Sequence, residues 1–371
     1  MKRTLIALIF LCTDNIGFSQ LNKIDSPIEN FEKLWKEFDL RYANFDAKQV
    51  HWDEVYEKHR ILINERTTNR QLFEISCSML QELNDGHVTI NPSFKEKDIE
   101  CGPPYTFTLE TAFDTDDRVS QFVSVMNLEL TRNGFSKPMK KKLSEDTNFQ
   151  YRVSDSFGYL RLDEMTEKNT FGKFNRALDE AIKAFYTKKG LIIDLRFNGG
   201  GWDYSAYKLA SRFIAKGKTI GHFERMRIKG TDEYTQMKYR KVKSKGKKQF
   251  AKPIVILTSD FTASAAEVFV LLMRELPNVS LIGENTEGIF SDMYEFKLPN
   301  KWTVTLSHQQ YFSQNKENFE GRGISPDIKI VNTRADIKNQ RDPVIQKAID
   351  HLKKKTTAKV DYSSLPDSNY F

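Results

Sequence analysis

Apolar residues recur at three- and four-residue intervals over residues 27–83, and this spacing predicts amphipathic helices with one buried face. The stripes are Phe31, Leu34, Trp35 and Phe38, then Trp52, Val55, Tyr56 and His59, then Leu72, Ile75, Leu80 and Leu83. Asn69 is expected to cap the last of these helices. The turn sequence 84–86 ends the region, and His87 and a short strand follow.

The pattern changes from residue 157 onward, where short apolar runs alternate with amphipathic segments. Strands are expected at 158–162, 191–195, 254–257 and 281–282, and helices at 170–187, 204–214 and 263–276. Strands that alternate with helices in this way indicate an α/β domain with a largely parallel sheet. Residues 291–312 are expected to form antiparallel hairpins, and residues 342–354 a helix.

Two segments have weaker patterns. Apolar and polar positions alternate only weakly over residues 95–150. The basic run at 140–142 is expected in a solvated loop or an edge hairpin. The basic stretch from Lys238 to Lys248 is expected to be a surface loop, with substrate steering as a secondary role.

The first residues are typical of a secretory signal peptide. A basic pair precedes an apolar run at 5–11, and the small residues Gly17 and Ser19 lie just before Gln20. Cleavage is therefore expected after Ser19, which predicts an exported protein, periplasmic or extracellular. A lipid anchor at Cys12 is less favoured, because the residue before it is a large leucine.

Charge and cysteine content add little to this. With 57 Lys and Arg against 50 Asp and Glu, the chain has a formal net charge of +7, which suits anionic surfaces. The charges are spread and no nucleic-acid motif is found, so no nucleic-acid partner is predicted. Cys77 and Cys101 are either free or paired in an oxidising compartment. No Cys/His spacing resembles a zinc site, so no metal is predicted.

Three polar clusters are candidates for chemistry at the carboxyl edge of a parallel sheet. The glycine run 199–201 lets backbone amides face an incoming oxygen. Ser264 lies at the start of a helix, near the positive end of its dipole. The segment 85–87 ends in His87, a candidate general base.

Each cluster also has a simpler interpretation. Ser264 is a common type of helix cap, and an isolated histidine such as His87 is more often structural than catalytic. A phosphate loop is disfavoured, because the Rossmann glycine spacing and a Walker lysine are both missing. The G-x-S-x-G elbow of α/β-hydrolases is missing as well. Trp202 is expected to pack at the start of the next helix, with a place in a substrate pocket as the alternative.

Four motifs nevertheless occur in one order along the chain. They are Asp194-Leu195-Arg196-x-Asn198-x-Gly200-Gly201, Thr262-Ala263-Ser264-Ala265-x-Glu267, Gly283-Glu284-x-Thr286-x-Gly288 and Glu320-Gly321-x-Gly323-Ile324-x-Pro326-Asp327. Together they resemble peptidase family S41, the tail-specific and tricorn-like peptidases, over about residues 155–332. The lead-in that ends at His87 is similar to the tricorn-like branch.

The resemblance implies a crotonase/ClpP-like αβ spiral core behind a small N-terminal helical domain. It implies Ser264 as the nucleophile, and an oxyanion hole made by the amide of Ala265 with that of Gly200 or Gly201. No cofactor is implied.

The resemblance also bears on the general base. One branch has a lysine directly after the third motif, but this chain has Ile289 there, which disfavours a Ser/Lys dyad. The tricorn-like branch has a histidine, matched by His87, and a glutamate, matched by Glu320, which either orients the base or only orders a loop. A serine can precede that histidine; this chain has Gly86, so a fourth member of the relay is missing or supplied otherwise.

The predicted organisation follows from these elements. It comprises a signal peptide at 1–19, a helical domain at 20–95, an α/β peptidase core at 96–335, and a C-terminal helix and tail at 336–371. Many tail-specific peptidases insert a PDZ domain, which needs about 80–100 residues. Only 70 residues separate His87 from Gly158, so no complete PDZ domain is predicted.

The leading hypothesis is an exported serine peptidase that cleaves peptides or unfolded proteins, with membrane contact at most transient. The alternatives are a non-catalytic relative that binds a peptide or apolar ligand in its cleft, and an esterase on the same scaffold. The natural substrate, the cleavage preference and the oligomeric state are not predicted.

Overall fold

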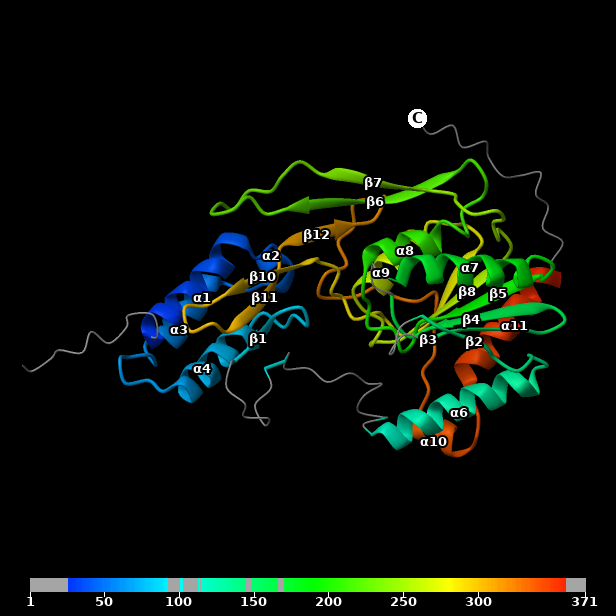
Figure 1. Ribbon diagram of the computed structural model, residues 1–371, viewed down its shortest axis with the longest axis horizontal. Coiled ribbons are helices and arrows are strands. Elements are labelled where there is room, and N and C mark those ends of the chain that lie inside the picture. The colour runs from blue at the N-terminus through cyan, green and yellow to red at the C-terminus, as the bar shows by residue number, and fades with distance from the viewer. Residues whose placement is uncertain are drawn as a thin grey trace, which may run out of the picture.

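A computed structural model describes residues 26–92, 101–102, 113, 115–143, 148–165 and 170–357. The predicted signal peptide, its cleavage site and Cys12 lie outside these residues. Figure 1 shows two lobes, one built from the first helices and the other from a sheet with helices around it. No helix within the described ranges has the length and apolar character needed to cross a membrane.

Four helices form the first part of the chain, as the apolar spacing predicts. They are α1 (Pro27–Arg41), α2 (Phe45–Lys48), α3 (Trp52–Arg60) and α4 (Asn69–Gln81). Thr68, not Asn69, caps α4: its hydroxyl accepts a hydrogen bond from the amide of Gln71, whose side chain accepts one from the amide of Thr68. This reciprocal pair is a capping box, and the cap is one residue earlier than the predicted Asn69.

The helical lobe shares its core with strands from far along the chain. Strands β1 (Thr89–Asn91), β10 (Met293–Lys297) and β11 (Thr303–Ser307) form an antiparallel sheet with β11 in the centre. Phe31 and Trp302 belong to the same buried apolar cluster. Thr89 is paired with Thr305, 216 positions later. The strand that follows His87 is therefore held by a distant part of the chain.

A seven-stranded sheet organises the second lobe, in the order β13-β9-β8-β5-β4-β3-β2. Its strands are β2 (Met139–Lys142), β3 (Asn148–Val153), β4 (Phe157–Leu162), β5 (Gly190–Asp194), β8 (Ile254–Thr258), β9 (Val279–Gly283) and β13 (Ile328–Lys329). The strands from β13 to β4 are parallel, and β3 and β2 add an antiparallel hairpin. The basic run 140–142 lies in edge strand β2, one of its two expected places.

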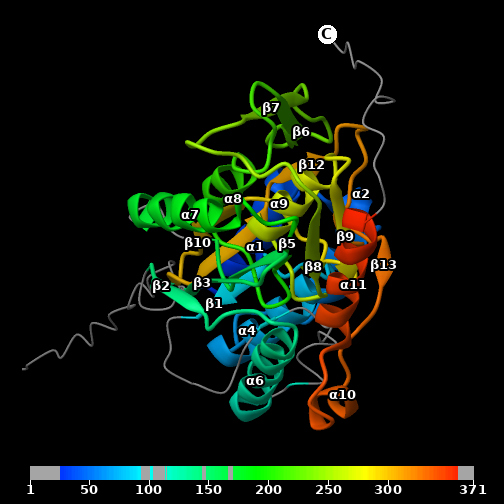
Figure 2. The same cartoon turned by 90° about the vertical axis from the view of Figure 1, so that its right-hand side faces the viewer.

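Helices cover both faces of this sheet (Figure 2). On one face lie α7 (Phe171–Phe185), α8 (Asp203–Ala210) and α9 (Ala265–Met273), which share an apolar cluster with Ile193. On the other lie α6 (Asp116–Arg132), α10 (Arg334–Lys338) and α11 (Pro343–Thr357), which share a cluster with Ile192. Adjacent residues of β5 thus point to opposite layers. The mixed α/β architecture is confirmed, although α8 is shorter than expected.

A third, antiparallel sheet has the order β12-β6-β7. Its strands are β6 (Thr219–Met226), β7 (Lys238–Lys243) and β12 (Gln309–Phe312). The expectation of a loop over 238–248 is wrong for its first half, which forms edge strand β7. Within β7 only Val242 is buried, so the strand has no apolar face for a sequence pattern to reveal. Lysines along such an edge hinder pairing with other strands.

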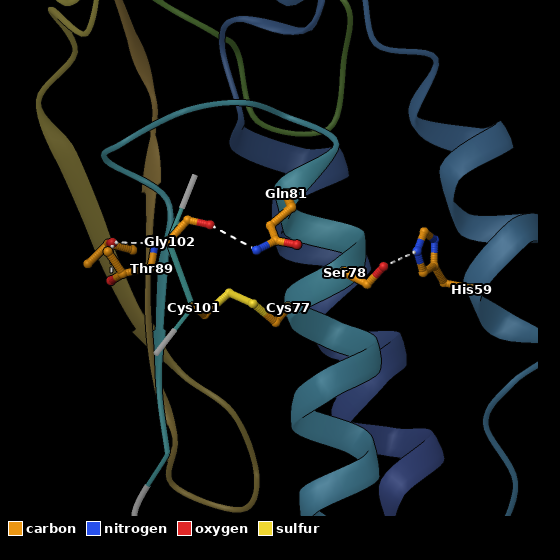
Figure 3. Close-up of a disulfide and its surroundings, with 8 residues drawn as sticks. His59, Cys77, Ser78, Gln81, Thr89, Cys101 and Gly102 are labelled. Carbon is orange, nitrogen blue, oxygen red and sulfur yellow. Dashed lines mark hydrogen bonds between the residues drawn. A yellow bond between two sulfur atoms is a disulfide. The ribbon is translucent and has the colours of Figure 1, made fainter. Parts of the chain in front are cut away.

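A disulfide joins Cys77 of α4 to Cys101, with 5.5 Å between the two Cα atoms. Figure 3 shows that Gln81, about one helical turn further along α4, donates to the carbonyl oxygen of Gly102, at 3.1 Å. The sequence left open whether these two cysteines are free or paired, and the structure shows that they are paired. Residues 101–102 are tied to α4 at two consecutive positions.

Candidate active site

Ser264 lies between the end of β8 and the start of α9, at the N-cap position. Its backbone has φ 52° and ψ −124°, a conformation that residues other than glycine rarely adopt. All 9 residues of α9 are buried, so the helix is a rigid support for the serine. The hydroxyl is thereby held near the positive end of the helix dipole.

Polar side chains tie the turn before Ser264 to the turn that follows β5. The hydroxyl of Thr262 donates to the carbonyl oxygen of Leu195 at 2.9 Å and accepts from the amide of Ser259 at 3.0 Å. The hydroxyl of Ser259 donates to the carbonyl oxygen of Arg196 at 2.6 Å. These bonds bring the Ser264 loop beside the glycine run.

Gly200 and Gly201 have φ values of 105° and 128°, which L side chains rarely adopt. A Cβ atom on Gly200 would lie 2.6 Å from Cβ of Ser264. A Cβ atom on Gly201 would lie 2.0 Å from the carbonyl oxygen of Met165. Glycine is therefore needed at both positions for steric reasons, and the run packs directly against Ser264.

The amides of the two glycines have different environments. Gly200 donates to Oδ1 of Asn198 at 2.9 Å, and the buried Asn198 side chain donates in turn to the carbonyl oxygen of Leu162 at 3.1 Å. Within the described part of the chain, the amides of Gly201 and Ala265 have no hydrogen-bond acceptor. Of the two glycines, Gly201 is the one whose amide is free to bind an oxyanion beside that of Ala265.

Glu267 is buried in the first turn of α9 and links it to the segment that follows β9. Its carboxylate accepts hydrogen bonds from the amides of Gly288 and Ile289, each at 2.8 Å, and from the amide of Ser264 at 3.3 Å. Burial raises the pKa of this carboxyl to about 7, against the opposing effect of the hydrogen bonds. The sequence identified Glu267 only as a motif position, without a role.

His87 lies in the turn between α4 and β1 and is buried. Its Nδ1 atom has no hydrogen-bond partner among the described residues. Burial lowers the pKa of the imidazole, whereas the carboxylates of Asp85 and Asp292 and a hydrogen bond with the backbone of Ser291 raise it. Burial has the larger effect, so the neutral imidazole, which can accept a proton, is favoured.

Asp85 orders the turn that carries His87. Its Oδ1 accepts from the amide of His87 at 2.9 Å, and its Oδ2 accepts from the hydroxyl of Tyr42 at 2.8 Å. Burial, followed by the charge of Asp85, raises the pKa of Tyr42 well above its usual value, so the hydroxyl remains a donor. Sequence analysis missed both roles, because Tyr42 lies in no motif and aspartate is common in turns.

Glu320 is buried beside this turn. Its Oε2 accepts from the amide of Phe290 at 3.0 Å, while its Oε1 has no partner within the described ranges. Burial raises the pKa of Glu320 well above its usual range, and the charge of Asp85 raises it further. Since Asp85 acts electrostatically on both His87 and Glu320, the three side chains form one cluster.

Residues 288–291 connect this cluster to Ser264. Ser264 donates to the carbonyl oxygen of Ile289, Glu320 holds the amide of Phe290, and His87 interacts with the backbone of Ser291. Within the described residues, no hydrogen bond joins His87 to Ser264 or to Glu320. The fold thus gathers the expected residues around one short segment but does not form the complete hydrogen-bonded relay.

Comparison with known sequences finds peptidases among the proteins similar to this chain. The profile of peptidase family S41 matches residues 156–330, and that of the tricorn protease C1 domain matches residues 26–81. The carboxy-terminal-processing protease of Bartonella bacilliformis is 28% identical over 211 residues, which are 55% of this chain and 46% of that protein. The carboxy-terminal processing protease CtpA of Bacillus subtilis is 29% identical over 210 residues, 55% of this chain and 42% of the relative. The matches thus span less than half the length of these two relatives.

Solved structures agree with the fold. One from Parabacteroides merdae, described only provisionally as a peptidase, has a TM-score of 0.70 and 28% identity, covering 88% of this chain and 96% of that one. Mature CPAF has a TM-score of 0.61 at 11% identity, covering 90% of this chain and 96% of its own. The tricorn protease has a TM-score of 0.54 at 15% identity, covering 90% of this chain and 37% of its own. The last two show likeness of fold alone.

The two profile matches follow the order of the elements described above. The tricorn C1 match covers α1 to α4, and the S41 match runs from the start of β4 to β13. Ser264, the glycine run and Glu320 lie within the second match. In its motifs, in these matches and in the arrangement of its fold, the chain is similar to peptidase family S41 over residues 156–330 and to the tricorn protease C1 domain over residues 26–81.

Proposed function

We propose that this protein is an exported serine peptidase that hydrolyses peptide bonds in peptides or unfolded proteins through an acyl-enzyme on Ser264. The backbone of Ser264 carries the proposal. An ordinary N-cap serine has an extended backbone, whereas Ser264 has φ 52° at the head of a fully buried helix. Such strain, about 1–3 kcal/mol, is concentrated at functional sites and serves no need of a simple cap.

In the proposed first step, Oγ of Ser264 attacks the carbonyl carbon of the scissile bond while His87 takes the hydroxyl proton. The amides of Gly201 and Ala265 donate to the oxyanion, each lowering the barrier by about 3 kcal/mol. The imidazolium of His87 then gives its proton to the leaving amine. Water, deprotonated in the same way, releases the acyl group from Ser264.

Glu320 is proposed to orient His87. Nδ1 of His87 and Oε1 of Glu320 are both buried without partners among the described residues, and buried polar atoms rarely remain so. A hydrogen bond between them, direct or through one water, would satisfy both atoms. The imidazolium formed during the reaction would also favour the ionised form of Glu320, whose pKa burial raises.

Export is proposed from the signal-like pattern of residues 1–19 and from the Cys77–Cys101 disulfide, since disulfides persist in oxidising compartments. For the core we propose the crotonase/ClpP-like αβ spiral, supported by the likeness to CPAF and tricorn. The curated relatives are named for carboxy-terminal processing. No preference for chain ends is proposed for this chain, because no complete PDZ domain is predicted in it.

Fluorophosphonate labelling, measured as intact mass, tests the proposal. The wild-type protein should gain one adduct, Ser264→Ala should gain none, and His87→Ala should label at least 100-fold more slowly. Ser120→Ala, which changes an exposed serine of α6, should label like wild type. Absence of an adduct on folded wild-type protein between pH 6.5 and 9 would refute the peptidase and favour the non-catalytic binding alternative.

A further inference from the structure

A basic groove of about 250 Å³ lies between α8 and β7. The residues that line it include Lys208 from α8, Arg240, Lys241 and Lys243 from β7, and Lys245 just beyond that strand. The buried residues Ser211 and Val242 also line it. Among the described residues that line this groove, none is acidic.

The positive charge of the groove is largely uncompensated. Arg240 pairs with Glu224 at 2.6 Å. In contrast, none of the four lysines forms an ion pair with a carboxylate of the described residues. The ammonium of Lys208 lies 4.7 Å from the centroid of the Tyr204 ring. Lysines that lack internal partners leave their charge available to a ligand of opposite sign.

The two walls of the groove run in the same direction. Tyr204, Tyr207 and Ser211 share one face of α8, and seven helical steps correspond to about 10 Å. Arg240 lies over the ring of Tyr207, and the amide of Lys245 donates to the carbonyl oxygen of Ser211 at 3.0 Å. About three residues of an extended peptide span the same 10 Å.

One end of the groove adjoins the candidate active site through the chain itself. Gly201 is followed directly by Trp202, the N-cap of α8, and Tyr204 lies in the first turn. The side chain of Trp202 is 51% exposed and that of Tyr204 45% exposed. The expectation that Trp202 packs at the helix start is therefore not met, and along the chain two accessible aromatic residues follow the glycine run before Lys208.

We propose that this groove binds the aspartate and glutamate side chains of an extended peptide substrate, on one side of the bond that is cleaved. The proposal rests on the proposed peptidase function and specifies its substrate class. Cations distributed over about 10 Å match two side-chain carboxylates three residues apart, whereas a single terminal carboxylate would engage the cations at one end only. The aromatic rings at the near end contact the peptide between the groove and Ser264.

Fluorescence anisotropy on the Ser264→Ala protein tests this without cleavage of the probe. The probes are fluorescein-labelled, amidated 12-residue peptides of Glu-Gly-Ser, Gln-Gly-Ser or Lys-Gly-Ser repeats. Further arms are the Gln-Gly-Ser peptide with a free carboxyl terminus, a 12-nucleotide oligothymidylate, and vesicles of 30% phosphatidylserine in phosphatidylcholine.

Two matched variants locate the binding. The groove variant carries Lys208→Gln, Lys241→Gln, Lys243→Gln and Lys245→Gln, and the control variant carries Lys183→Gln, Lys297→Gln, Lys338→Gln and Lys347→Gln. Each removes four positive charges, and the control residues are exposed and do not line the groove. Melting curves establish that both variants are folded.

We expect the Glu-Gly-Ser peptide to bind at least tenfold more tightly than the Gln-Gly-Ser peptide in 50 mM salt, and to lose most of this advantage in 500 mM salt. The groove variant should bind it at least tenfold more weakly, and the control variant within threefold of the parent. Equal affinity for the two peptides, or an equal loss in both variants, would overturn the proposal. The proposal would also be overturned if the groove lysines bound another ligand more tightly than the acidic peptide. These ligands are the neutral peptide with a free terminus, the oligothymidylate and the vesicles.

Fluorophosphonate labelling separates this inference from the proposed function. Labelling of the wild-type protein reports on the reactivity of Ser264, which does not line the groove. If the protein is labelled but binds the acidic and neutral peptides equally, only the proposed role of the groove is refuted. If the protein prefers the acidic peptide but is not labelled, the proposed peptidase function is refuted and the groove remains a binding site for acidic peptides.

Discussion

The amide of Ser264 donates a hydrogen bond to the carbonyl oxygen of Ile289, with 3.1 Å between nitrogen and oxygen. The next two residues after Ile289 have contacts with Glu320 and His87. Groups from three distant parts of the sequence therefore take their positions from one stretch of backbone. A displacement of this stretch would alter the proposed nucleophile, base and orienting carboxylate together.

Charges near His87 should set the acid limb of the labelling rate, because only the neutral imidazole accepts a proton. Lys48 lowers the pKa of His87 and Asp292 raises it. We expect Lys48→Gln to move the acid limb to higher pH and Asp292→Asn to move it to lower pH. Fluorophosphonate labelling rates from pH 4.5 to 8 measure both. Shifts in the same direction would show that His87 is not the titrating base.

Gly200→Ala should disable the site more than it disturbs the fold. Its new Cβ would meet Cβ of Ser264 at 2.6 Å and the carbonyl oxygen of Ala263 at 2.9 Å, so Ser264 must move. We expect labelling to slow at least 100-fold, since displacements of about 1 Å can have that effect. Gly217→Ala is the control, because that glycine also has positive φ but nothing within 4 Å of an added Cβ. If both variants label normally, the glycine run does not position the nucleophile.

Glu267 should make stability fall as pH rises. Burial raises its pKa to about 7, so between about pH 4.5 and 7 the folded chain retains a proton that the unfolded chain releases. The free energy of unfolding should decrease across this window by up to about 3 kcal/mol. Urea unfolding at pH 5 and pH 8 should show a smaller difference for Glu267→Gln than for wild type. The exposed Glu295→Gln should retain the wild-type difference.

The disulfide should stabilise the helical lobe. It closes a loop between residues 24 positions apart, for which the chain-entropy model gives about 3 kcal/mol. The double variant Cys77→Ser with Cys101→Ser should lose about this free energy of unfolding, as should wild type in reductant. Calorimetric melting with and without dithiothreitol measures both. A wild-type melting temperature that does not respond to reduction would contradict the bond's contribution.

The sequence pattern sufficed for the parts of the fold whose partners are local or fully buried. The parallel strands β4, β5 and β8 are apolar runs, and each is buried along its whole length. Ser264 and the glycine run follow two of these strands, so the predicted edge of the sheet located them. Family resemblance added Glu320 and linked it to His87, already a candidate base, although no spacing in the sequence connects the two residues.

Long-range contacts were beyond the reach of the pattern. Tyr42 and Asp85 meet through the packing of α1 against the turn after α4, and nothing local marks either residue as a partner of the other. The sequence pattern did not predict strand β7, because five of its six positions are exposed. The predicted domain boundaries near 95 and 335 remain predictions, although the helical lobe already includes residues from β10 and β11 in its core.

Because β1 pairs with β11, the strand beside His87 gains its partner only late in the synthesis of the chain. A ribosome completes Ser264, the glycine run and α9 before it reaches residues 303–307, which pair with the strand beside His87. Until then the nascent chain contains the proposed nucleophile without the partner strand that fixes the position of the base. Because chains fold from their N-terminal parts as they are synthesised, translation itself delays assembly of the site until most of the chain exists. If the proposed mechanism holds, a nascent chain gains a positioned base for Ser264 only after this late strand has been made.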